Sequence, residues 1–386
     1  MSRTRRRAVL VGINIFVFVL LIAAAESICS LFAARPWDHV VPSWRLNHRW
    51  KPNSSSVHSE WAAGNPEFPE PYVHVYNAQG WLEKYDVRKK KPAGTFRIFY
   101  VGDSFTEGTV PMDASVPSLI EKRLESEYAG DDVEFEVINT GTMSYSPAIY
   151  YVLVRYVLAE YSPDLIVVNV DMTDVFDDWK YSSTLVFDDR GDPVAVPPRD
   201  PYEASFIDTE EGAVKNDLLN KMRLFLYYHS YVYNFLLNST GKDRAEQERS
   251  GMSSRWGWCL REWSEATTAN VEMTKDFLRR LASFCRGRGI KLMYTAVPHY
   301  RQFAGRPDGT GDPLWSAKPH EVIAKLAAEE DVPYLNSWEA LKPEIEGTPR
   351  NRYYYSGDMH FNPRGYRIWA EVQWNFLTNR ANGLLP

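Results

Sequence analysis

Five short segments of strand length, some of them continuous apolar runs, recur along the chain and alternate with stretches in which apolar residues follow a helical period. The run at 165–170 is apolar almost throughout, as expected of a strand buried on both faces, whereas residues 133–138 alternate apolar and polar side chains. Strands that alternate with helices form a parallel sheet with helices on both faces. The pattern therefore predicts an α/β fold, with strands at 96–101, 133–138, 165–170, 290–297 and 333–336 and helices near 116–124, 147–161, 270–286 and 319–329.

The alternation lapses after residue 178, and we interpret about 179–268 as an insertion that caps the crevice of the sheet. Two apolar triplets flank the turn-rich segment 188–193, which indicates a hairpin, and an aromatic helix is expected from Met222 to Leu237. The aromatic side chains of the insertion either offer stacking platforms for sugar rings or pack the insertion onto the body, which is the commoner role of large aromatics. They are Tyr227, Tyr228, Tyr231, Tyr233, Trp256, Trp258 and Trp263.

Several arginines at the N-terminus precede an almost unbroken apolar run from Ala8 to Ala25, about the minimum length that crosses a bilayer as a helix. We interpret residues 1–35 as a membrane anchor, with a cleaved signal peptide as the alternative. Because basic residues stay on the cytoplasmic side, a single pass through the inner (cytoplasmic) membrane would leave the remainder periplasmic or extracellular. Residues 36–94, rich in proline and tryptophan, are expected to form an extended linker or arm with little regular structure.

A chain of 386 residues leaves 95–386 for one large α/β domain that carries the insertion. The net charge of −6 and the dispersed basic residues argue against nucleic acid as a partner. The three cysteines show no metal-ligand spacing. Cys259 and Cys285 either pair outside the cytoplasm or remain unpaired buried thiols, and we favour the unpaired thiols.

The first strand ends in Gly102-Asp103-Ser104, where a small residue allows a sharp turn that would expose the Ser104 hydroxyl at the carboxyl edge of the sheet. A serine becomes a good nucleophile when an imidazole takes its proton and a carboxylate orients that imidazole. His360 and Asp358, close together near the C-terminus, supply these two groups. The structural alternatives are that Ser104 only caps a helix and that His360 only precedes the last helix.

These two segments resemble blocks of the SGNH (GDSL-like) hydrolase superfamily. Gly102-Asp103-Ser104 is similar to its first block, and Asp358-Met359-His360 to its fifth, with the Asp-x-His spacing of membrane-anchored and alginate O-acetyltransferase-like members. The resemblance implies a three-layer flavodoxin-like sandwich with a central parallel sheet, an insertion after the third strand and an N-terminal transmembrane helix. It also implies a serine esterase or O-acyltransferase with Ser104 as nucleophile, His360 as base and Asp358 as its orienting carboxylate.

The resemblance further implies three donors for the oxyanion that forms during acyl transfer. Ser104 and Gly141 match the family's two backbone donors, but Thr173 stands where the family has an asparagine, in Asp171-Met172-Thr173-Asp174. Loss of one such donor costs on the order of 10²–10³ in rate. Substrate contacts are expected from Asp103, Asp174 and His299, although simple packing is an equal alternative for His299.

A metal site is the other chemical interpretation, because Asp103, Asp171, Asp174, Asp177, Asp178 and His360 follow predicted strands or precede a helix. No tight ligand spacing supports it, so no metal and no cofactor are expected. The predicted function is ester hydrolysis or acyl transfer through an acyl-serine intermediate, acting on O-acetyl groups of cell-envelope or exported carbohydrate or on another small ester. The alternative is a catalytically weak glycan-binding or assembly protein on the same scaffold.

Overall fold

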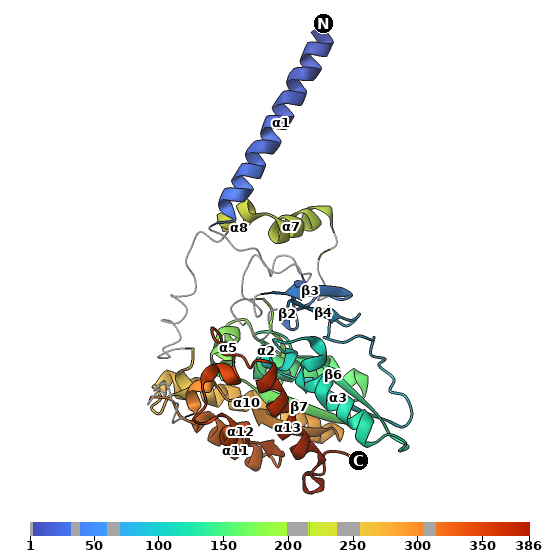
Figure 1. Cartoon of the computed structure of the whole chain (residues 1–386), viewed down its shortest axis with the longest axis vertical. Helices are drawn as coiled ribbons and strands as arrows, with labels where there is room; N and C mark the ends of the chain where they lie inside the picture. The colour runs from blue at the N-terminus through green and yellow to red at the C-terminus, as the bar shows by residue number, and fades with distance from the viewer. Residues whose placement is uncertain are drawn as a thin grey trace.

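The computed structural model describes residues 3–31, 39–59, 70–198, 215, 217–237, 255–303 and 314–386. Helix α1 (Arg3–Cys29) projects from the rest of the molecule as one long helix (Figure 1). An apolar window within Arg5–Cys29 has a mean hydropathy of 2.8, and none of it is buried. The helix is thus long and apolar enough to span a membrane or to be a signal sequence.

The body is built on a five-stranded parallel sheet in the order β11-β10-β7-β5-β6. Numbered along the chain, the parallel strands therefore stand in the order 2-1-3-4-5, which is the flavodoxin-like doubly wound arrangement. The predicted α/β fold with a central parallel sheet is confirmed. The strands are β5 (Thr95–Val101), β6 (Glu134–Asn139), β7 (Leu165–Val170), β10 (Lys291–Ala296) and β11 (Tyr334–Leu335).

Helices cover both faces of this sheet and complete a three-layer sandwich (Figure 1). One face packs against α3 (Val116–Glu127), α12 (Ser337–Ile345) and α13 (Pro363–Thr378). The other face packs against α4 (Pro147–Tyr156), α10 (Glu265–Arg288) and α11 (Lys318–Glu329). Two further helices, α2 (Ser104–Glu107) and α5 (Asp174–Ser182), begin at or near the carboxyl ends of β5 and β7.

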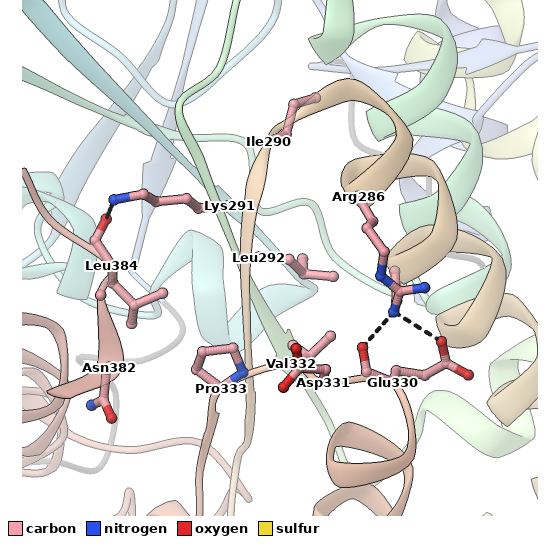
Figure 2. A pocket seen from close by; sticks show the side chains of 12 residues that line it. Arg286, Ile290, Lys291, Leu292, Glu330, Asp331, Val332, Pro333, Asn382 and Leu384 are labelled. Carbon is pink, nitrogen blue, oxygen red and sulfur yellow. Dashed lines mark hydrogen bonds and ion pairs between the residues drawn. The ribbon is translucent and has the colours of Figure 1, made fainter.

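The two edges of the sheet differ in what lies there. The carboxyl edge carries the turn with Ser104 and the segment that begins at Asp171. The amino edge, where β10 and β11 begin, carries a pocket of about 270 Å³ (Figure 2). Arg286 and Glu330, which line this pocket, form an ion pair across 3.3 Å. Since the pocket lies at the edge opposite Ser104, it is separate from the candidate site described below.

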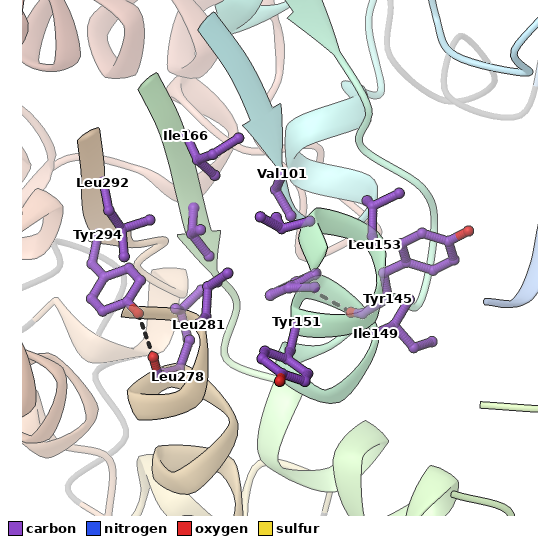
Figure 3. Close-up of a cluster of buried hydrophobic side chains, with 14 of the residues drawn as sticks. Val101, Tyr145, Ile149, Tyr151, Leu153, Ile166, Leu278, Leu281, Leu292 and Tyr294 are labelled. Carbon is purple, nitrogen blue, oxygen red and sulfur yellow. Dashed lines mark hydrogen bonds between the residues drawn. The ribbon is translucent and has the colours of Figure 1, made fainter. Parts of the chain in front are cut away.

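The alternation of side chains along β5 divides the core into two clusters. Phe99 and Val101 point toward α4 and α10, in the cluster that Figure 3 shows in part. Ile98 and Tyr100 point toward α3 and α13. Figure 3 also shows the Tyr294 hydroxyl donating to the carbonyl of Leu278 over 2.6 Å, which satisfies a buried polar group in an apolar surrounding.

The arm before the sheet is more regular than the sequence interpretation expected. Two antiparallel hairpins form there, β1 (Val40–Ser43) with β2 (Asn47–Trp50) and β3 (Ser54–His58) with β4 (Tyr72–Tyr76). The expectation of little regular structure was therefore wrong, because the aromatic residues give these strands a buried face: Trp50 and Tyr76 stack with ring centroids 4.8 Å apart. Most of the proline-rich segment 66–71 lies outside the described residues.

In the insertion, the predicted hairpin is present as β8 (Val186–Phe187) and β9 (Pro193–Ala195). The single helix predicted over 222–237 is instead two helices, α7 (Leu218–His229) and α8 (Tyr231–Leu237), because Ser230 adopts an extended conformation with φ −112° and ψ 120°. The Trp258 indole is fully buried and donates to the carbonyl of Met172 over 2.6 Å. Trp258 therefore packs the insertion onto the body.

Cys259 and Cys285 are both buried and unpaired, as the sequence interpretation favoured. Burial raises the pKa of the Cys285 thiol to about 12, so this side chain stays protonated at neutral pH. Neither thiol has the environment of a reactive cysteine.

Candidate active site

The turn after β5 is built so that Ser104 is the first residue of α2. Asp103 precedes that helix and its Oδ1 accepts the backbone N–H of Phe105 at 2.9 Å, as an N-cap residue does. A Cβ on residue 102 would overlap the Thr106 hydroxyl and lie 2.9 Å from the Thr106 Cβ, so glycine alone fits there. Ser104 thus stands on a tight strand-to-helix turn at the carboxyl edge of the sheet.

A second loop, just before α13, carries Asp358 and His360. Its shape is fixed by a β-bridge between Tyr354 and Phe361 and by the backbone bond from the Tyr355 amide to the His360 carbonyl, 3.0 Å long. Asn362 ends the loop as the N-cap of α13 and accepts two backbone N–H groups. The imidazole of His360 packs beside the Phe105 ring, with centroids 4.5 Å apart.

The structure brings the three residues of the predicted triad together in line. Ser104 Oγ lies 2.7 Å from His360 Nε2, and His360 Nδ1 contacts Asp358 Oδ1 at short hydrogen-bond range. The Asp358 carboxylate also accepts the His360 backbone N–H at 2.9 Å. With Nδ1–H donated to the carboxylate, Nε2 is left as the acceptor for the serine proton, the tautomer that this network assigns.

The charge on Asp358 is stabilised by its hydrogen bonds. Burial of this half-buried carboxyl acts to raise its pKa, but the hydrogen bonds and charge of the His360 side chain and the backbone N–H groups of His360 and Met359 outweigh it, so the pKa of Asp358 is lowered. The guanidinium of Arg350 also donates to the Asp358 carbonyl. Asp358 is therefore ionised at neutral pH and can hold a positively charged imidazole.

Two tyrosines that the sequence interpretation did not single out join the nucleophile turn to the histidine loop. The Tyr355 hydroxyl donates to the carbonyl of Thr109 over 2.7 Å, and the Thr109 N–H donates to the Tyr366 hydroxyl over 3.2 Å. All three residues are buried. Their bonds connect the segment after α2 to the loop of His360 and to α13, but no local signal in the sequence marks such long-range partners.

Two of the predicted oxyanion donors already have other acceptors. The Gly141 N–H donates to the Asn139 side chain over 3.0 Å, and the Thr173 hydroxyl donates to Asp171 Oδ2 over 2.5 Å. A Cβ on residue 141 would overlap the backbone of Glu107, so Gly141 permits a close approach between the β6 turn and α2. As the first residue of α2, Ser104 has an N–H with no acceptor inside its helix.

Asp103, Asp171 and Asp174 form a buried group of carboxyls beside Ser104, with one oxygen of each within 4.8 Å of the others. Burial first, and then the neighbouring charges, raise the pKa of Asp103 and that of Asp174 well above their usual range. Each carboxyl also serves the local backbone or a neighbouring hydroxyl: Asp174 accepts from the Asp171 N–H at 3.0 Å and from the Tyr150 hydroxyl at 3.2 Å. These carboxyls could hold a cation by their spacing, but their contacts are those of a hydrogen-bonded core.

The predicted substrate residue His299 is buried in an aromatic cluster. Its ring stacks on Trp315 with centroids 4.5 Å apart and also contacts Trp256 and Tyr300. Its Nδ1 accepts the Arg301 N–H at 3.2 Å. These contacts are what the packing alternative for His299 expects. Asp103, in contrast, does lie at the site, with its Oδ2 3.4 Å from Ser104 Oγ.

No protein-family model and no curated protein sequence matches this chain. Solved structures with a similar fold include TesA, at 14% identity and a TM-score of 0.39 over 75% of this chain and 99% of that one. Another is Axe2, an acetylxylan esterase from Geobacillus stearothermophilus, at 10% identity and a TM-score of 0.42 over 73% and 94%.

A third is CEX, a two-domain esterase active on acetylated mannans, at 12% identity and a TM-score of 0.38 over 76% of this chain and 52% of that one. The molecule is an α/β protein in which hydrogen bonds connect a serine to a histidine and that histidine to an aspartate, at the carboxyl edge of the sheet.

Proposed function

We propose that this protein is a serine esterase or O-acyltransferase of the SGNH type that acts through an acyl-serine intermediate. The observation that carries the proposal is the line of contacts from Ser104 Oγ to His360 Nε2, 2.7 Å, and from His360 Nδ1 to Asp358. This order of hydroxyl, imidazole and carboxylate is what nucleophilic acyl transfer requires. In this proposal residues 1–35 anchor the chain, 36–94 form an arm and 95–386 form the catalytic domain.

In the proposed reaction, His360 Nε2 takes the Ser104 proton as Oγ attacks the ester carbonyl carbon. The imidazolium, held by the ionised Asp358, then gives that proton to the leaving alcohol, and the ester bond breaks to leave an acyl-serine. Water or a sugar hydroxyl next gives its proton to His360 as its oxygen attacks the acyl carbon. The bond from that carbon to Ser104 Oγ then breaks while His360 returns the proton to Oγ, which releases the free acid or the new ester. Hydrolysis and transfer differ only in which hydroxyl arrives.

The developing oxyanion would be held first by the Ser104 N–H. Gly141 and Thr173, proposed as further donors, would each have to leave the acceptor it now holds, Asn139 or Asp171. A site with a single ready donor would be slower than one with three, since each donor is worth on the order of 10²–10³ in rate. Asp103 and Asp174, and less directly His299, are proposed to shape the substrate side of the crevice.

The substrate class and location follow from the resemblance of the two sequence blocks and from α1. We propose O-acetyl groups on carbohydrate of the cell envelope or of an exported polysaccharide, with the chain anchored once in the inner membrane and its N-terminus inside. Extraction of membranes at alkaline pH tests the anchor: the full-length chain should stay in the pellet, whereas a cleaved signal would release a chain that lacks α1.

Labelling with a fluorophosphonate tests the catalytic assignment. The wild-type chain should be labelled, and Ser104→Ala and His360→Ala should lose both the label and ester hydrolysis, by on the order of 10⁴-fold or more in rate. Asp358→Asn should lose on the order of 10⁴-fold. Ser183→Ala, at an exposed serine, is the matched control and should keep full labelling. Activity that resists all three triad variants would exclude the proposal, and activity that a chelator abolishes would point to a metal instead.

The contacts of Gly141 and Thr173 favour one rival, a catalytically weak protein that holds glycan in the same crevice. A folded wild-type chain that takes no fluorophosphonate label but binds acetylated oligosaccharide would support this rival. In that case Ser104→Ala should leave oligosaccharide affinity nearly unchanged, because the hydroxyl would serve no covalent step.

A further inference from the structure

Helix α7 exposes an apolar face, which ends at His229 in the last turn, where the imidazole packs against the Phe225 ring. Five of its large apolar side chains are exposed in the structure, at fractions from 39% to 75%: Leu218, Leu219, Met222, Phe225 and Leu226. At about 100° per residue these five positions cover an arc of about 120°, the width of the buried stripe of an amphipathic helix. Here that stripe faces outward. Phe235 of α8 is also exposed.

The opposite side of α7 faces the protein and is buried or half-buried. Asn220, Tyr227 and Tyr228 lie on the other side of the helix and are buried or half-buried. Lys221 and Arg223 flank the apolar arc on its two sides, where long cationic side chains can reach past an apolar layer to a polar boundary. A cationic rim around an outward apolar face is typical of helices that lie in a membrane interface.

The α7–α8 pair is fixed to the end of α1. The Glu26 carboxylate, in the last turns of α1, accepts the Tyr231 N–H at 2.6 Å and the Ser230 hydroxyl. In Figure 1 α8 lies at the lower end of α1 and α7 continues beside it, between the long apolar helix and the body. This is where a membrane surface would be if α1 crosses a bilayer, which is the part of the proposed function on which this inference rests.

The pair is also fixed to the catalytic body. The Tyr228 hydroxyl donates to the carbonyl of Val40 in β1 over 2.7 Å. The hairpin of β1 and β2 in turn contacts the turn after β6, where His48 Nε2 bonds the Met143 carbonyl at 2.8 Å. Since that turn lies at the carboxyl edge of the sheet, this edge is on the side of α7.

We propose that α7 and α8 lie in the membrane–water interface on the side where α1 leaves the inner membrane. The apolar face of α7 is then in contact with lipid, and the carboxyl edge of the sheet is turned toward the membrane. The occupant of this face is thus a lipid surface, because the apolar face continues from the exposed apolar surface of α1 and is flanked by cations. A second helical anchor of this kind stops the body from rotating about α1 and holds the crevice at one orientation to the bilayer.

Spin labels on the full-length chain test this arrangement in vesicles of phosphatidylethanolamine and phosphatidylglycerol. Single cysteines replace Met222 or Phe225 in a Cys29→Ser background, in which Cys259 and Cys285 are buried and unreactive. The matched control is Phe187→Cys, an exposed aromatic position in β8. Each label's collision rates with oxygen and with a water-soluble nickel chelate are compared, because oxygen concentrates in lipid and the chelate in water.

The expected result is that collisions with oxygen exceed those with the chelate at 222 and 225, and that the ratio is reversed at 187. The proposal fails if the labels at 222 and 225 match the label at 187, or if they are shielded from both reagents, because protein would then cover this face. Since the measurement needs no turnover, it stands even if Ser104 proves inactive. Mass analysis of the reconstituted chain verifies beforehand that α1 is retained.

Discussion

The Tyr355 hydroxyl donates a 2.7 Å hydrogen bond to the carbonyl of Thr109, and this bond joins the loop of His360 to the turn that follows the helix of Ser104. The partners are 246 residues apart in the chain. Because both are buried, the bond is shielded from water and is well suited to hold the hydroxyl of Ser104 at a fixed distance from the imidazole.

Replacing Tyr355 with Phe should therefore loosen the site. The variant leaves the buried Thr109 carbonyl without this donor, and we expect a loss of about 1–3 kcal/mol in the free energy of unfolding and a lower kcat with little change in KM. Tyr353→Phe is the control, since that hydroxyl makes a longer bond, 3.4 Å, to Glu344. Equal effects of the two variants on kcat would show that Tyr355 does not position the triad.

Gly102→Ala should damage both stability and activity, because the new methyl group would overlap the Thr106 hydroxyl and displace α2. Overpacking of this kind costs about 1–3 kcal/mol. Urea unfolding of both single variants and of the double variant Gly102→Ala/Thr106→Ala checks the cause. The double variant should be less destabilised than the sum of the two singles, whereas strict additivity would place the strain elsewhere.

Thr173→Val decides whether this hydroxyl stabilises the oxyanion. In the structure the hydroxyl donates to Asp171, so we expect its loss to lower kcat by less than about 10-fold, far below the 10²–10³ of a true oxyanion donor. The measurement is kcat for a small acetyl ester, with unfolding curves to separate stability from rate. A loss of 10²-fold or more in a folded variant would instead make Thr173 the third donor.

Asp178 should make stability depend on pH. Asp178 belongs to α5, and its carboxyl is fully buried against the start of α4. There it accepts from the Ser146 hydroxyl at 2.6 Å and the Ala148 N–H at 2.9 Å, and it also accepts from the Thr274 hydroxyl of α10 at 2.7 Å. Burial, only partly offset by these bonds, raises the pKa of Asp178 to about 7. Between pH 4 and 7 the folded chain thus holds a proton that the unfolded chain releases, so this residue lowers stability as pH rises through that range.

The expected test result follows from comparing wild type with Asp178→Asn. The free energy of unfolding of the wild type should fall between pH 5 and pH 8 by more than that of the variant, with a difference on the order of 1–3 kcal/mol. Other buried carboxyls contribute to both chains, so the difference between them isolates Asp178. Parallel pH dependences would mean that Asp178 is ionised throughout this range.

The order of strands and helices could be predicted from the sequence, because the spacing of apolar residues within each segment indicates whether that segment is a strand or a helix. The apolar run of β7 and the helical spacing in α3 are local patterns, and alternating such elements leaves few topologies. The residue types of the candidate site were local as well: a glycine two residues before Ser104 and a carboxyl two residues before His360. The structure also upholds the unpaired state of Cys259 and Cys285.

Other features were decided only by tertiary structure, because they depend on which distant segments meet. The hairpins of the arm have a buried face because Trp50 of one hairpin stacks on Tyr76 of the other. The bond from Tyr355 to Thr109 joins residues that are 246 positions apart. The acceptor of Thr173 depended on how Asp171 turned at the end of β7.

The clearest case is α7. Its sequence shows an amphipathic helix, and by itself that pattern predicts an apolar face packed against the body. In the tertiary structure the contact of Glu26 with Tyr231 and the bond from Tyr228 to Val40 hold the helix pair, and that face points outward, beside α1. Periodicity fixes which side chains share a face, but the direction in which the face points is set by contacts between segments far apart in the chain.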